Sequence, residues 1–124
     1  MGAGFIYDDI GHIVTANHVL AGANNVSVVF KDGDRYDAYV VGRDAFTDTA
    51  VLKLVENDST VAKEDIRLTK PVTLGNSSAL KIGDRVVTIG YPFASKIALT
   101  AGIIGQTDYL LHFPFLGYSV PNTI

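Results

Sequence analysis

The amino-acid sequence predicts an all-β protein. Short apolar runs rich in Val and Ile are separated by clusters of Gly, Asp and Asn, the residues that hairpin turns use. Apolar residues make up 48% of the chain, which favours a folded core, and no long segment repeats its apolar residues at the helical period. Many short strands with almost no helix indicate a β-barrel or a β-sandwich.

Composition excludes several classes of function. The chain has 124 residues and a net charge of −3 without a Lys/Arg cluster, which argues against nucleic acid or an anionic membrane as the main partner. It has no cysteine, so neither disulfides nor cysteine-ligated zinc are expected. No H-E-x-x-H pattern is present, and we predict no metal and no cofactor. Neither a signal peptide nor a transmembrane segment is visible in the chain, and its compartment stays unknown.

The first hairpin is predicted at the start of the chain. Ala3–Tyr7 and His12–Asn17 form its strands, and Asp8–Gly11 supplies residues that tolerate turn geometry. We expect His12 to be an exposed turn residue rather than a ligand. A short helical turn ending at Gly22 follows the second strand.

A second hairpin is predicted next. Asn25–Phe30 alternates loosely, and Lys31–Asp34 turns the chain into the strand Arg35–Gly42. Alternate residues of that strand share one face, and we predict that this face is buried in the core. Its residues are Tyr36, Ala38 and Val40.

The remaining elements are less regular. Glu56–Lys70 is polar and indicates a surface connection, and Pro71–Leu74 is predicted to begin a bridging strand. Val86–Gly90 and Ile97–Gly105 are apolar strands, and the glycines of the latter suggest a bulge or a bend. His112 lies in an aromatic, proline-punctuated stretch, and we expect a loop residue there.

Two residues carry the chemistry. His18 follows an apolar strand, where it can be held rigidly and still face a cleft, and Asp48 directly precedes the strand Ala50–Val55. A histidine oriented by a carboxylate is the base half of a nucleophilic triad. Taken alone, Asp48 is better explained as a turn or capping residue, whereas its pairing with His18 favours the catalytic interpretation. The nucleophile motif Gly-x-Ser-Gly-Gly is absent from the sequence.

Six blocks stand in order along nearly the whole chain. They are Gly2–Tyr7, Ile13–Leu20, Tyr36–Asp44, Asp48–Leu54, Lys81–Pro92 and Leu99–Gly105. In this order and spacing they resemble the amino-terminal part of the HtrA/Deg family of trypsin-like serine proteases. By that resemblance His18 is the general base and Asp48 its orienting acid. The family's nucleophile segment would follow soon after Ile124, so we expect this chain to be inactive alone.

The resemblance also implies an architecture and a function. The fold would be a chymotrypsin-like double barrel, with residues 1–72 forming a six-stranded first barrel and residues 73–124 beginning an incomplete second one. The function would be that of an ATP-independent serine endopeptidase for protein quality control, acting on unfolded polypeptides or peptides. Members of the family are usually extracytoplasmic or membrane-associated.

Two alternatives stay open. Ser119 is the best-placed substitute nucleophile, but the Val120-Pro121 that follows it supplies neither the close-approach glycines nor an N–H at the proline. The chain can also be a non-catalytic peptide-binding or assembly module derived from such a protease. In that case exposed strand edges would pair with peptides or with a second copy.

Overall fold

The computed structural model describes residues 1–55, 70–91, 96–107, 109–113 and 118–123, the last two ranges as backbone only. The chain divides into two compact units, Met1–Thr73 and Leu74–Ile124. His18 and Asp48 both lie in the first unit, and Ser119 lies in the second.

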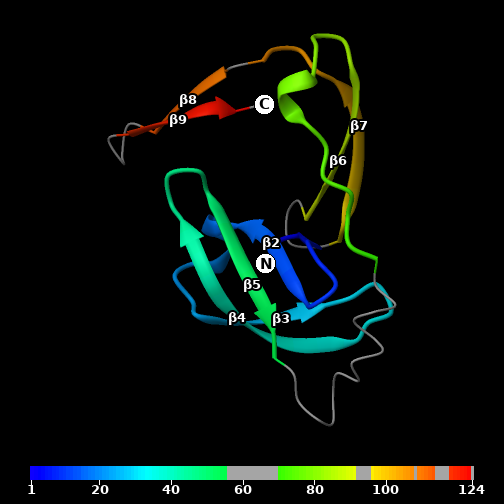
Figure 1. The fold of residues 1–124 in the computed structure, drawn as a ribbon, viewed down its shortest axis with the longest axis vertical. Coiled ribbons are helices and arrows are strands. Elements are labelled where there is room, and N and C mark those ends of the chain that lie inside the picture. The colour runs from blue at the N-terminus through cyan, green and yellow to red at the C-terminus, as the bar shows by residue number, and fades with distance from the viewer. Residues whose placement is uncertain (56–69, 92–95, 108, 114–117, 124) are drawn as a thin grey trace. The chain divides into compact units, whose positions relative to one another are not determined.

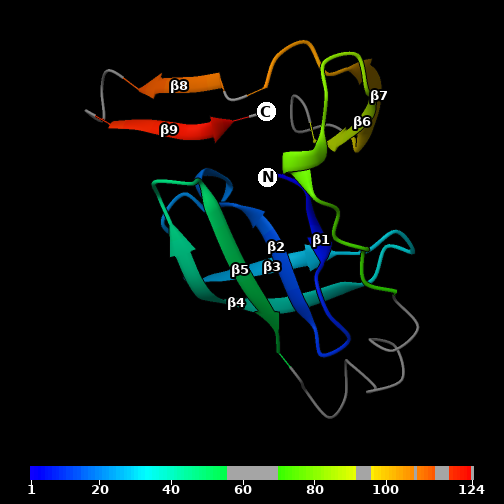
Figure 2. The same ribbon diagram turned by 45° about the horizontal axis from the view of Figure 1, so that its top comes forward.

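The first unit is built on a five-stranded antiparallel sheet with the strand order β1-β2-β5-β4-β3. Figures 1 and 2 show that this sheet is strongly curled. Its elements are β1 (Gly4–Ile6), β2 (His12–Ala16), the short 3₁₀ helix η1 (Asn17–Leu20), β3 (Asn25–Val29), β4 (Arg35–Asp44) and β5 (Thr49–Leu54). The six-stranded barrel that the resemblance implies stays a prediction, since the described part of this sheet has five strands.

Strand β4 joins the two sides of the sheet. Its first half pairs with β3 and its second half with β5. The register shifts between Val40 and Gly42, which leaves Val41 as the extra residue of a β-bulge. A bulge bends its strand, and Figures 1 and 2 show β4 turning from the side of β3 to the side of β5. The loop that contains Asp48 follows directly after the end of β4.

The core of the first unit lies on one face of the sheet. Ile13 on β2 is opposite Leu52 on β5, and both side chains are 4% exposed. The full buried cluster is Ile13, Leu20, Ala38, Ala50, Leu52 and Leu54. Tyr36 and Val40 pack against it, which confirms the predicted inner face of β4. Burial of each large apolar side chain contributes about 1.5–3 kcal/mol, so this cluster holds β2, β4 and β5 together.

Two glycines let the N-terminal segment pack closely. A Cβ atom at Gly2 would lie 2.4 Å from a methyl carbon of Val19, and one at Gly4 would lie 2.9 Å from the carbonyl oxygen of Val14. Contacts this short are not tolerated by a real Cβ. The glycines therefore allow the segment to support both β2 and η1.

The described part of the second unit contains two two-stranded sheets. Its elements are η2 (Ser77–Ala79), β6 (Arg85–Gly90), β7 (Ala98–Ile103), β8 (Tyr109–Phe113) and β9 (Tyr118–Thr123). Strands β6 and β7 pair with each other, as do β8 and β9, all antiparallel. One face of the β6–β7 pair carries apolar side chains that are 58–68% exposed. We call it the apolar ribbon face; its residues are Val87, Ile89, Leu99 and Ile103.

The predicted all-β class is confirmed, with three local corrections. His112 lies in strand β8 rather than in a loop, because the aromatic and apolar residues around it favour a strand more than the nearby prolines oppose one. Of the bulge or bend expected in Ile97–Gly105, a bulge is absent from β7, whose register with β6 is continuous; register shifts lie instead in the β4–β5 and β8–β9 pairs. Pro71–Leu74 is not a strand. The expected surface connection Glu56–Lys70 falls outside the described residues, apart from its last residue. None of the helices described is long and apolar enough to cross a membrane.

Candidate active-site dyad

His18 lies in η1, directly after β2. The chain is still extended at Ala16 (φ −77°, ψ 136°), and the buried Leu20 anchors the turn in the core. The N–H of Ala21 then donates to the carbonyl of His18 at 3.3 Å, which closes the turn. The side chain of His18 is nevertheless 75% exposed. The fold thus combines a fixed backbone with an accessible imidazole.

Asp48 is the last residue of loop 45–48, which connects β4 to β5. Its φ of 54° lies in the left-handed region. Asp enters this region more readily than most residues, because its short polar side chain can make local hydrogen bonds. The carbonyl of Asp48 also accepts the backbone N–H of Asn17 at 3.0 Å. The loop is therefore bonded directly to the segment that contains His18.

The carboxylate of Asp48 contacts two different atoms of His18. Oδ1 accepts the backbone N–H of His18 at 2.8 Å, and Oδ2 lies 2.5 Å from Nδ1 of the imidazole. An ionised carboxylate can only accept hydrogen bonds, so Nδ1 carries the proton and Nε2 is left as the acceptor. A general base in a nucleophilic triad requires this tautomer. We call His18 and Asp48 the dyad.

Asp48 orients the imidazole of His18, but the contact between the two side chains does little to stabilise the fold. The side chain of Asp48 is 40% exposed and that of His18 75% exposed, so water screens their attraction. Exposed pairs of this kind contribute about 0–1 kcal/mol to stability. The contact therefore contributes little to the stability of the fold.

Backbone strain is concentrated beside the dyad. Among the described residues, the non-glycine positions with positive φ are Ala21 (49°) and Asp48 (54°). A residue with a Cβ atom in this region costs about 1–2 kcal/mol. Oδ1 of Asn17, next to His18, is also buried without a hydrogen-bond partner among the groups described. Such features persist only where the surrounding structure holds them, and they gather at functional sites.

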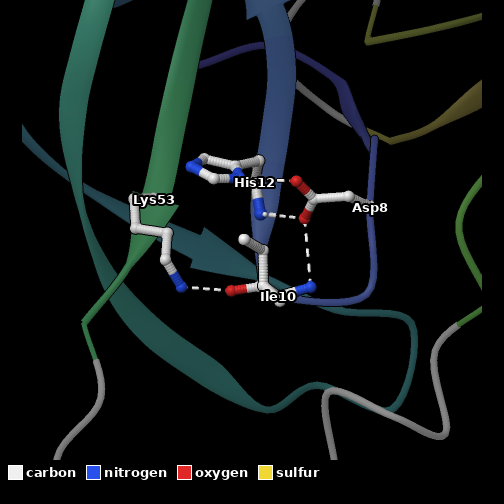
Figure 3. Close-up of polar contacts among 4 residues, drawn as sticks. All are labelled: Asp8, Ile10, His12 and Lys53. Atoms are coloured by element: carbon white, nitrogen blue, oxygen red, sulfur yellow. Dashed lines mark hydrogen bonds and ion pairs between the residues drawn. The ribbon is translucent and has the colours of Figure 1, made fainter.

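A second His–Asp pair, at the other end of β2, has the same connectivity. Oδ1 of Asp8 accepts the backbone N–H of His12 at 3.0 Å, and Oδ2 lies 2.5 Å from Nδ1. Figure 3 shows that Asp8 also accepts the N–H of Ile10, at 3.1 Å, and that Lys53 donates to the Ile10 carbonyl. The expectation of an exposed turn residue at His12 is wrong, because this pairing holds it half-buried at the start of β2.

The pKa of Asp8 reflects this pairing. Partial burial raises the pKa of the carboxyl group, but hydrogen bonds from the backbone and side chain of His12 and from the backbone of Ile10 outweigh it. The pKa of Asp8 therefore lies below its usual value of 3.8. Because both side chains of the pair are only 26% exposed, we interpret the pair as a structural contact that stabilises the β1–β2 turn.

The other predicted nucleophile candidate belongs to the second unit. Ser119 lies in β9 and pairs with His112 across the β8–β9 hairpin, in the second unit. Within the described residues, no group of three His, Cys, Asp or Glu side chains is arranged to hold a metal ion.

Residues 2–122 match the family model of the trypsin-like peptidase domain. The chain belongs to the trypsin-like peptidase family. The resemblance to HtrA/Deg proteases is confirmed by its curated relatives. This peptidase-family chain is 39% identical over 122 residues to the "Probable periplasmic serine endoprotease DegP-like" of Pseudomonas savastanoi pv. phaseolicola (strain 1448A / Race 6), covering 98% of the chain and 22% of that relative. It is 40% identical over 103 residues to the "Protease Do-like 1, chloroplastic" of Arabidopsis thaliana, covering 83% of the chain and 22% of the relative.

Solved structures support the same family. The HtrA-type protease AlgW with a decapeptide superposes with a TM-score of 0.69 at 35% identity, covering 86% of this chain and 30% of that one. AlgW with a tripeptide gives the same TM-score. The fold of this trypsin-like peptidase chain is therefore of the chymotrypsin-like all-β type. The chain spans about a fifth of the length of the curated relatives it matches, 22% in both cases above.

Proposed function

We propose that this chain supplies the general base and the orienting acid of an HtrA-like serine endopeptidase. The observation that carries the proposal is the double contact between Asp48 and His18, which selects the tautomer with Nε2 as acceptor. The family membership of residues 2–122 and the strain around the dyad support it. The activity would be ATP-independent and would serve protein quality control.

In the proposed reaction, Nε2 of His18 takes the proton of a serine hydroxyl as the serine oxygen attacks a peptide carbonyl. Asp48 holds the ring and stabilises the imidazolium that forms. The same proton then passes from Nε2 to the leaving amine. The sequence contains no Gly-x-Ser-Gly-Gly segment, so the serine and its oxyanion-stabilising N–H groups are not supplied by these residues. We therefore propose that the chain alone is inactive.

The proposed substrates are unfolded polypeptides or peptides. AlgW, to which the chain is 35% identical, has been solved with a decapeptide and with a tripeptide. An extended peptide also suits an all-β protein, because it can add to a sheet edge through main-chain hydrogen bonds.

A chimera tests the proposal. Residues 1–124 would be joined to the remainder of the protease domain of the Pseudomonas relative, and labelling by a fluorophosphonate probe and hydrolysis of casein would be measured. We expect the chimera to be active and His18→Ala to lower turnover by a factor on the order of 10⁴–10⁶. His12→Ala is the matched control and should keep the activity. An active His18→Ala chimera would contradict the proposal.

The isolated chain gives a complementary test. It should neither react with the probe nor degrade casein, because it supplies no nucleophile. Stoichiometric labelling would instead identify a serine within the chain as the nucleophile, and Ser119→Ala would then be the first variant to make.

The non-catalytic module is the second candidate function. The apolar ribbon face favours it, since its four large side chains are 58–68% exposed. An inactive chimera combined with tight binding of unfolded polypeptide by the isolated chain would support this alternative.

A further inference from the structure

The last two residues of β4 each contact one of the two segments that hold the dyad. Arg43 bonds to the residues after η1, and Asp44 bonds within loop 45–48. Neither of these bonds goes to the side chain of His18 or Asp48. Any influence on the dyad would therefore pass through the backbone.

Arg43 holds the segment that follows His18. Its Nη2 donates to the carbonyl of Ala23 at 2.6 Å and to Oδ1 of Asn24 at 3.1 Å. The N–H of Ala23 in turn donates to the carbonyl of Leu20 at 2.9 Å, in the last position of η1. The guanidinium thus ties the end of the His18 turn to the end of β4.

Asp44 shapes the loop that carries Asp48. Its Oδ1 accepts the N–H of Phe46 at 2.9 Å, and its Oδ2 accepts the hydroxyl of Thr47 at 2.9 Å. A carboxylate that bonds to groups two and three residues ahead fixes the direction of a turn. Loop 45–48 ends with Asp48 in the left-handed region, which is strained for a residue with a Cβ atom.

We propose that Arg43 and Asp44 are positioning residues for the dyad. Arg43 fixes the backbone that follows His18, and Asp44 fixes the loop that presents the Asp48 carboxylate to the imidazole. The two residues are neighbours at the end of one strand, so β4 is bonded to both segments that hold the dyad. This inference deepens the proposed function and rests on it.

The competing interpretation is that Asp44 only stabilises a turn. The tautomer of His18 separates the two interpretations. If Asp44 positions Asp48, its loss should shift the His18 imidazole away from the form protonated at Nδ1. If Asp44 only stabilises the turn, the unfolding free energy should fall while the tautomer stays the same.

The experiment is ¹⁵N NMR of the imidazoles in the chain of 124 residues. The Asp8–His12 pair is an internal reference, because it has the same contacts and lies at the other end of β2. We expect His18 and His12 in the unmodified chain to be protonated mainly at Nδ1. In Asp44→Ala, His18 should shift mainly to the Nε2-protonated form of free imidazole, and His12 should not change.

Three further variants sharpen the test. Asp44→Asn should keep most of the Nδ1-protonated His18, since its amide oxygen can still accept the N–H of Phe46. Thr47→Val removes a single bond to Asp44 and should give an intermediate shift. Arg43→Met, which keeps an unbranched stem but has no N–H donor for either acceptor, should broaden the His18 signals.

An unchanged His18 tautomer in Asp44→Ala would overturn the proposal. Loss of the Nδ1-protonated form at both His18 and His12 would also overturn the proposal, because Asp44 would then support the fold as a whole. If Asp44→Ala does not fold, Thr47→Val decides by the same criterion. The NMR measurement of the His18 tautomer does not depend on hydrolysis. An unchanged tautomer in Asp44→Ala can therefore be told apart from an inactive chimera, which would contradict the proposed function itself.

Discussion

Oδ2 of Asp48 lies 2.5 Å from Nδ1 of His18, while Oδ1 of the same carboxylate accepts the backbone N–H of His18 at 2.8 Å. The side-chain bond alone would allow the ring and the carboxylate to move together. The backbone bond prevents this, because it fixes the carboxylate relative to the main chain of η1. The imidazole is therefore oriented relative to the core of the sheet.

This double contact predicts the effect of Asp48→Asn. The amide oxygen can still accept the backbone N–H, but the amide nitrogen would donate to Nδ1 and stabilise the wrong tautomer. We expect turnover of the chimera to fall by a factor on the order of 10⁴, with little change in stability. Steady-state kinetics and urea unfolding measure the two effects. Asp8→Asn is the control, and a loss of activity as large as that of Asp48→Asn would contradict the assignment.

Acid should weaken the first hairpin through Asp8. Its pKa is lower in the folded chain than its usual value, so the folded state binds fewer protons there than the unfolded state. The carboxylate thus stabilises the fold above the ordinary carboxyl pKa of about 3.9. That contribution is lost as the pH falls through the lower folded value. The difference in unfolding free energy between the unmodified chain and Asp8→Asn should shrink as the pH falls below about 5. A constant gap would contradict this prediction.

The strain at Ala21 predicts opposite effects for two identical substitutions. Ala21 has a φ of 49°, whereas Ala16 has a φ of −77°. Ala21→Gly should stabilise the chain by about 0.5–1 kcal/mol, because glycine relieves the strain at a modest entropic cost. Ala16→Gly should destabilise it by about 0.5–1 kcal/mol. Chemical unfolding of both variants checks the prediction, and equal effects would be evidence against strain at Ala21.

Replacing a core leucine by alanine should lower the unfolding free energy far more than replacing a surface leucine. Leu52 is 4% exposed between β2 and β4, while Leu99 is 68% exposed on the apolar ribbon face. Leu52→Ala should cost about 2–5 kcal/mol of unfolding free energy, through lost burial and the cavity left behind. Leu99→Ala should change it by less than about 0.5 kcal/mol. Urea unfolding of both variants measures the difference.

The apolar ribbon face also predicts self-association of the isolated chain. A two-stranded sheet with exposed apolar side chains and open edges can pair with a second copy. Ile89→Lys should reduce association, because it places a charge in the middle of that face. Sedimentation across a concentration series measures this. Thr88→Lys, on the opposite face of β6, is the matched control. A stable monomer at high concentration would contradict the prediction.

The sequence predicts most of the first unit because its strands alternate and its turns use Asp and Gly. The meeting of His18 and Asp48 was predicted mainly from the resemblance to the HtrA/Deg family, since two residues that each border an apolar strand need not come together. The Asp8–His12 pair was missed because a carboxylate in a turn is most simply read as a turn residue. The position of the bulge depends on how β4 meets two neighbours, and no local pattern encodes that. The signal for Asp44 was the Asp-x-x-Thr spacing to Thr47, which is typical of side-chain-closed turns.

The two His–Asp pairs of this sheet have a consequence for recognising proteases from coordinates. A template that searches for a carboxylate oxygen near Nδ1, with the second oxygen on the same residue's backbone N–H, matches twice among the side chains that the structure describes. Distances cannot rank the two matches, because both Nδ1 contacts measure 2.5 Å. Accessibility ranks them: the His18 side chain is 75% exposed and the His12 side chain 26% exposed. A template that includes the solvent exposure of the imidazole would select the first pair and reject the second.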